Sequence, residues 1–138
     1  MQKSTTSFSF LKYWKSLLWA VIIAIGLFTP GDKLTESKLF QIEQLDKILH
    51  FLIFGFLQFL ILLDMHMGNV TITGRRIYFS VLVSIFYGIV TEIIQYLFIS
   101  ERKGSIFDFF ADITGIILSV GFFFLIRKFI DRLRPLKN

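Results

Sequence analysis

The sequence predicts an all-α integral membrane protein, built as a bundle of four transmembrane helices. Of its 138 residues, 54% are hydrophobic and only 18% are charged, and the mean hydropathy is +0.68. A water-soluble domain of this size needs a larger charged surface, so a disordered chain, a collagen-like fibre and an ordinary cytosolic enzyme are all disfavoured. With 0 Cys, the chain has no disulfide framework, thiolate nucleophile or cysteine metal site.

Four apolar stretches approach the roughly 20 residues that a transmembrane helix needs. They cover residues 11–29, 47–63, 77–100 and 106–126. The segments between them contain the Gly, Pro, Asn or charged residues that are typical of loops. Because the chain shows neither a repeat nor a second composition, we predict one transmembrane domain over residues 1–138, with a motif-bearing core at 46–126 and a basic tail at 127–138.

The first stretch has a second interpretation as a secretory signal, because Lys3, Lys12 and Lys15 precede its apolar core. No small-x-small cleavage site follows it, and the Thr-Pro-Gly at residues 29–31 is typical of a helix end. We therefore expect an uncleaved helix. Either interpretation leaves the later helices in the same orientation.

The distribution of basic residues predicts the orientation of the helices, because loops rich in Lys and Arg stay on the cytoplasmic side. Ten of the 15 Lys and Arg residues lie in the two chain ends and the second loop, and five lie in the first and third loops. Both termini are therefore expected in the cytoplasm.

The basic balance of the chain indicates membrane lipid as a partner and no nucleic acid. The net charge is +5, but the basic residues lie at helix ends and no aromatic-interleaved RNA-binding motif accompanies them. Each Lys or Arg beside an anionic lipid surface contributes about 1 kcal/mol of attraction. The same residues are also explained by a role in topology alone, so this alternative stays open.

Polar and small residues recur inside the last three apolar stretches, where ionisable groups are costly and usually mark a site. They are Asp46, His50 and Gln58 in the second stretch, Ser84, Gly88, Glu92 and Gln95 in the third, and Ser105, Asp108, Asp112, Gly115 and Ser119 in the fourth. Most steps are of three or four residues, which keep side chains on one helix face. We expect the three faces to meet, because Gly and Ser allow close helix approach and lipid rejects carboxylates.

The predicted orientation places the ionisable residues of all three faces in the outer half of the membrane. Asp46 and His50 begin their helix after an outside loop, Glu92 ends its helix before one, and Asp108 and Asp112 begin theirs after it. The sequence therefore predicts a polar pocket that opens to the extracytoplasmic side.

Each of these residues also has a local structural explanation. Asp46 can be a helix N-cap, Ser105 and Asp108 fit a capping box, and His50 can be an ordinary hydrogen-bonded interior residue. Glu92 and Asp112 lie beyond capping reach, which leaves them neutral or paired with His50 or with Arg102. A buried structural ion pair remains the alternative to a site for these two carboxylates.

The same residues resemble the motifs of the VanZ-like family of small bacterial membrane proteins. The Asp-Lys-x-x-His-Phe motif is present as Asp46, Lys47, His50 and Phe51, the Glu-x-x-Gln pair as Glu92 and Gln95, and the Arg-x-x-Ser-x-x-Asp segment as Arg102, Ser105 and Asp108. The resemblance covers residues 46–126. Two positions depart from it, since the family often has Asn at the place of Asp112 and Gly at the place of Ser119.

The resemblance implies a multi-pass protein of the bacterial cytoplasmic (inner) membrane that acts in the cell envelope. The founding member of the family lowers susceptibility to the glycopeptide antibiotic teicoplanin, which implies a role in antibiotic resistance. No biochemical activity follows from the resemblance.

The leading hypothesis is a protein that binds or remodels an amphiphilic envelope component, such as a lipid-linked envelope precursor or a lipophilic glycopeptide. Arg102 and Lys103 would attract an anionic head group, and the many Phe side chains would accommodate the apolar tail. The expected ligand-binding residues are Asp46, Lys47, His50, Glu92, Gln95, Arg102, Ser105, Asp108 and Asp112.

Three alternatives use the same residues. The first is a membrane-embedded enzyme acting on a lipid-linked substrate, with His50 and Glu92, Asp108 or Asp112 as acid/base groups or ligands of a divalent metal. The chain lacks a Gly-x-Ser-x-Gly elbow, a His-Glu-x-x-His helix and a phosphate-binding Gly loop. The others are a proton-coupled or ion-conducting unit and a plain helical scaffold. The sequence assigns no resident metal and leaves any cofactor and the oligomeric state undetermined.

Overall fold

The computed structural model describes residues 10–28, 43–98 and 106–133, and every regular element in these ranges is a helix. A 3-10 turn, η1 (Phe10–Tyr13), leads into α1 (Trp14–Phe28). The other helices are α2 (Glu43–Met67), α3 (Gly74–Phe98) and α4 (Ile106–Leu133). The predicted all-α fold is confirmed for the part of the chain that is described.

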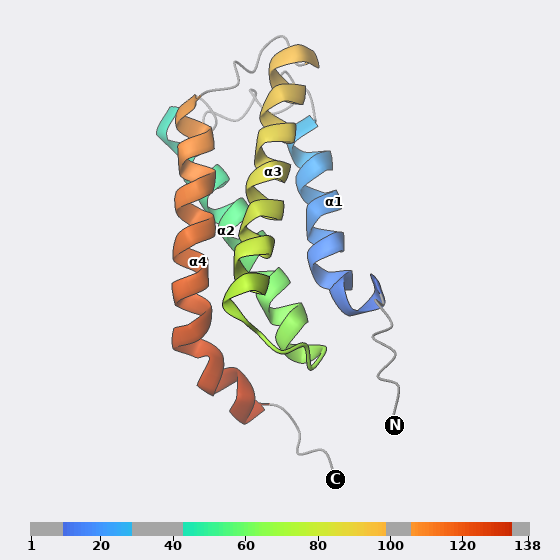
Figure 1. The fold of residues 1–138 in the computed structure, drawn as a ribbon. Helices are drawn as coiled ribbons and strands as arrows, with labels where there is room; N and C mark the ends of the chain where they lie inside the picture. Colours follow the sequence, from blue (N-terminus) through green and yellow to red (C-terminus); the bar gives the residue numbers. More distant parts are fainter. Residues whose placement is uncertain (1–9, 29–42, 99–105, 134–138) are drawn as a thin grey trace.

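The helices alternate in direction and lie side by side (Figure 1). We call the end at which α2 and α4 begin and α3 ends the upper end, and the opposite end the lower end. The longest interface joins α2 to α4, and α1 packs at the edge of the bundle, mainly against α2. The described chain therefore begins and ends at the lower end, where α2 is also linked to α3.

Helix α2 is longer than the predicted 47–63, and its lower end is closed by Asn69. This residue has a positive φ of 55°, which Asn tolerates better than most residues. The Asn69 N–H donates to the His66 carbonyl and the Val70 N–H to the Met65 carbonyl, the pattern of a Schellman motif. Asp64 and His66 therefore lie inside the helix, and the prediction that 64–76 is a loop is wrong for its first residues.

The other helix bounds also shift from those predicted. Helix α3 begins at Gly74, three residues before position 77, because Thr73 caps it by accepting from the Arg76 N–H at 3.4 Å. Helix α4 continues beyond position 126 to Leu133. The expected end of the first helix at residues 29–31 lies outside the described residues.

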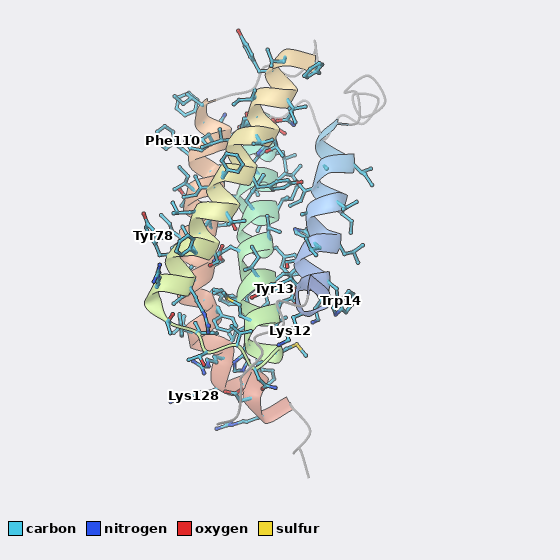
Figure 2. All side chains as sticks on the ribbon, turned by 45° about the vertical axis from the view of Figure 1, so that its right-hand side comes forward. Lys12, Tyr13, Trp14, Tyr78, Phe110 and Lys128 are labelled. Carbon is cyan, nitrogen blue, oxygen red and sulfur yellow. The ribbon has the colours of Figure 1, made fainter. Side chains whose placement is uncertain are left out.

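Three of the helices, α2, α3 and α4, are long and apolar enough to cross a membrane. Large apolar side chains are exposed along their outer faces, and Figure 2 shows Trp14, Tyr78 and Phe110 pointing away from the bundle. Such a surface is stable against lipid, which is as apolar as these side chains. Helix α1, with 15 residues, is about 22 Å long and is by itself shorter than the hydrocarbon core.

The interior of the bundle is more polar than its surface. Among the described residues, more polar than hydrophobic side chains are buried. The buried residues of α3 are Ser80, Ser84, Gly88, Thr91 and Gln95, which are all small or polar. The predicted polar faces of α2, α3 and α4 thus point toward one another, as expected where lipid surrounds the helices.

Two glycines set the close contact between α2 and α4. A Cβ on Gly55 would lie 3.0 Å from the Gly115 carbonyl oxygen, and a Cβ on Gly115 would overlap the Phe51 carbonyl oxygen. The two backbones touch at this level, which only residues without a side chain permit. This contact fixes the register of the two helices that carry most of the predicted site residues.

Candidate functional site

Five ionisable residues meet at the upper end of the bundle, and we call them the upper cluster. They are Asp46 and His50 from α2, Glu92 from α3, and Asp108 and Asp112 from α4. His50, Asp108 and Asp112 are buried, with 2%, 6% and 1% of their surface exposed, and Asp46 is half-buried. All five were predicted site residues, and the structure brings all five together.

The imidazole of His50 lies between two carboxylates from different helices. Its Nδ1 is 3.1 Å from Asp112 Oδ1, within hydrogen-bond distance, and 3.5 Å from Glu92 Oε1. The ring is stacked on Phe54, with 6.2 Å between the ring centroids. Because Nδ1 carries at most one proton, it can donate to only one of the two carboxylates at a time.

Two buried oxygen atoms in the cluster, Glu92 Oε1 and Asp112 Oδ2, have no hydrogen-bond partner among the described residues. A Cβ on Gly88 would lie 3.2 Å from Asp112 Oδ2, so the glycine makes room for this carboxylate against α3. A buried carboxylate oxygen without a donor is costly. The arrangement therefore favours a ligand that supplies a proton or a positive charge.

The second half of the cluster lies nearer the upper end of the bundle. A ring nitrogen of His50 and carboxylate oxygens of Asp46 and Asp108 all lie within 4.8 Å of one another. The cluster thus holds four carboxyl groups around one imidazole. Its charge favours cations, ammonium groups and hydroxyl donors over a bare anion.

The remaining predicted site residues are placed differently. Lys47 Nζ lies 5.7 Å from the centre of the Phe107 ring, a cation-π contact near the upper ends of α2 and α4. Gln95 is buried on the face of α3 that carries Gly88 and Thr91. Arg102 and Ser105 lie outside the described residues.

The structure decides between several local explanations. Asp46 is not an N-cap, because α2 already begins at Glu43. Asp108 lies in the first turn of α4, where a carboxylate is favoured by the helix dipole, but it also borders His50. Glu92 and Asp112 both face His50, as one of the predicted alternatives stated.

The upper cluster is separated from the polar groups deeper in the bundle. Gln58 donates to Ser80 Oγ at 2.8 Å and accepts from Ser84 at 2.8 Å. The fully buried ring of Phe54 lies between Gln58 and His50 along α2. This apolar break disfavours a continuous proton path through the described helices.

A second polar group, the lower cluster of Lys15, Ser16 and Asp64, was missed. The Asp64 carboxylate is fully buried and accepts from Lys15 Nζ at 3.0 Å, from the Ser16 N–H at 3.0 Å and from Ser16 Oγ at 2.9 Å. The available signal was its spacing, because Asp64 follows His50 by 14 residues, about four helical turns. It therefore shares the buried face of α2.

The same end of the bundle holds a second missed pair, His66 and Asp131. Their side chains approach to 2.6 Å and join α2 to α4. Asp131 is 46% exposed. Neither Asp64 nor this pair was among the polar residues predicted inside the apolar stretches.

Comparison with known proteins identifies a family. The model of a family described as VanZ/LLP1 matches residues 3–127, which is most of the chain. No curated protein and no solved structure matches. The match covers α1, α2, α3, most of α4 and every residue of the upper cluster.

Proposed function

The chain belongs to the VanZ/LLP1 family, and from this we propose that it is a multi-pass cell-envelope protein whose upper cluster binds the polar head of an amphiphilic envelope component. The candidates are a lipid-linked envelope precursor and a lipophilic glycopeptide antibiotic. The observation that carries the proposal is the group of buried His50, half-buried Glu92 and buried Asp112, in which two buried oxygens lack a partner among the described residues. Such groups at membrane depth are retained for a function more often than for stability.

We propose that all four helices cross the bacterial inner membrane, with both termini in the cytoplasm and the upper end outside. Helix α1 follows η1 directly and extends about 22 Å, so the residues that flank it complete the proposed span of the hydrocarbon core. Lys12 and Lys128 lie toward the lower end (Figure 2), as do Arg75 and Arg76 at the start of α3. These basic residues support a cytoplasmic lower end.

Single-cysteine labelling tests this orientation. The natural chain has 0 Cys and is therefore the unlabelled control. We expect Phe98→Cys, at the upper end of α3 and 77% exposed, to react in intact cells with a membrane-impermeant maleimide. Thr71→Cys, exposed in the lower link, should react only after the membrane is permeabilised. The reverse pattern would place the upper cluster on the cytoplasmic side and contradict the proposal.

The surroundings of the cluster suit an amphiphile. The carboxylates accept hydrogen bonds from hydroxyl and ammonium groups of a head group. Phe107 and Phe110 are exposed near the start of α4, and Phe98 is exposed at the end of α3. An acyl or prenyl tail can therefore remain in the bilayer along these rings while the head enters the bundle.

Glu92→Gln is expected to weaken ligand binding roughly tenfold or more, since it removes the charge that faces His50 and keeps the side-chain volume. Native mass spectrometry of the protein in mild detergent, with a lipid-linked precursor and with teicoplanin added separately, measures this binding. Cells that express the variant should show the glycopeptide susceptibility of cells without the protein. Asp131→Asn, at the far end of the bundle, is the matched control and should bind as the natural protein does. Equal binding by Glu92→Gln would contradict the proposal.

A membrane-embedded enzyme is the second candidate function, favoured by the 3.1 Å contact between His50 Nδ1 and Asp112 Oδ1. A carboxylate that orients an imidazole is a common general-base arrangement. The same incubations decide between the two functions. Release of a product from the lipid-linked precursor, lost in His50→Ala, would show turnover, whereas a ligand recovered intact and in stoichiometric amount would show binding.

A further inference from the structure

We propose that His50, Glu92 and Asp112 form a binding site for a divalent transition-metal ion, with Zn²⁺ as the best fit. The proposal concerns the described side chains alone and does not rest on the binding of an amphiphile. One residue comes from each of α2, α3 and α4. A bound ion would therefore join all three long helices at the upper end.

The spacing of the three side chains matches that of metal ligands. Two atoms that each lie about 2.1 Å from a tetrahedral zinc ion are about 3.4 Å apart. The observed separations are 3.1 Å from His50 Nδ1 to Asp112 Oδ1 and 3.5 Å from His50 Nδ1 to Glu92 Oε1. One potential ligand atom from each residue lies within 4.8 Å of the others, so an ion can enter with small side-chain movements.

The unpartnered oxygens are an independent observation that points to a cation. Within the part of the chain that the structure describes, Glu92 Oε1 and Asp112 Oδ2 are buried without a hydrogen-bond donor, and only 1% of the surface of Asp112 is exposed. A pair held only by hydrogen bonds would leave both oxygens desolvated without compensation. A divalent ion supplies the missing positive charge to both carboxylates at once.

The ligand types and their neighbours favour a borderline ion over Mg²⁺ or Ca²⁺. Imidazole with carboxylates suits Zn²⁺ and similar ions, while Mg²⁺ and Ca²⁺ prefer oxygen ligands only. Asp46 and Asp108 also lie next to His50, and carboxylates beside a ligating histidine commonly orient its ring. Three protein ligands leave a fourth position open.

Metal binding is tested on the full chain, purified in detergent through a tag without histidine and stripped with a chelator. Titration with ZnCl₂ by calorimetry should show about one site per chain, and elemental analysis should confirm the bound ion. Glu92→Gln and Asp112→Asn are each expected to weaken the affinity roughly tenfold or more. The control is again Asp131→Asn, which alters the other His and Asp pair of the chain and should bind normally.

X-ray absorption on the zinc-loaded natural protein keeps the test decisive if the variants fail to fold. The spectrum should show one imidazole nitrogen with oxygen ligands at about 2.0–2.2 Å. The proposal is overturned if the natural protein binds no zinc, if both variants bind it unchanged, or if the spectrum shows no imidazole or two. The chain contains 2 His, so a second imidazole would come from His66 or from another copy. These results are obtained without any lipid or drug, so the amphiphile proposal stands or fails separately.

Discussion

Replacing Gly115 with alanine is expected to lower the free energy of unfolding by about 3 kcal/mol, the upper end of the usual cost of overpacking. The added Cβ would overlap the Phe51 carbonyl oxygen and approach the Gly55 N at 3.2 Å. Both are backbone atoms, which cannot move aside as a flexible side chain does. The helices α2 and α4 must therefore separate, and the atoms of the upper cluster separate with them. Unfolding by SDS in mixed micelles, followed by circular dichroism, measures the loss.

Gly121→Ala on the same helix is the matched control. A Cβ at Gly121 meets nothing within 4 Å, so the substitution is expected to be neutral or to stabilise α4 by up to about 1 kcal/mol through helix propensity. If the two variants had equal stability, the close contact between α2 and α4 would not be present in the folded protein.

Asp64→Ala is expected to loosen α1 from the rest of the bundle, at a cost of about 3 kcal/mol, because it breaks a part-buried ion pair and leaves the Ser16 N–H without its acceptor. The variant removes the carboxylate that accepts from the Lys15 ammonium group and from the Ser16 N–H. Ser16 lies in the first turn of α1. A backbone N–H in the first turn has no acceptor within its own helix. Asp64 therefore acts as a helix cap supplied by another helix.

Hydrogen–deuterium exchange with mass spectrometry distinguishes this local effect from global unfolding. Amide exchange should rise in α1 (Trp14–Phe28) and stay slow in the centres of α2 and α4. Asp131→Ala is the control, because its carboxylate is 46% exposed and its loss is expected to change exchange only near the end of α4. Unchanged exchange in α1 of Asp64→Ala would show that other contacts hold this helix. Two other hydrogen bonds join α1 to the bundle: Trp19 donates to the Ile53 carbonyl of α2, and Tyr87 of α3 donates to the Ala20 carbonyl.

The helix bounds show where sequence reasoning loses accuracy. The interior of each helix was predicted, because long apolar runs persist over many residues, whereas the ends depend on single hydrogen bonds. The end of α2 depends on a left-handed Asn69, and the start of α3 depends on the Thr73 cap. Asp64 was placed in a loop because a carboxylate is costly in lipid, and only its burial against Lys15 and Ser16 removes that cost.

The sequence by itself determined that the chain is a helical membrane protein and which faces of α2, α3 and α4 are buried. Both follow from one physical cause, because lipid tolerates apolar side chains and excludes polar ones, so composition and the 3.6-residue period suffice. Only the tertiary structure decided that Glu92 and Asp112 share one imidazole nitrogen, and that Asp64 holds α1. These contacts depend on the relative height of the helices, which no spacing within one helix encodes. For α2 and α4, the close approach of Gly55 and Gly115 sets that height.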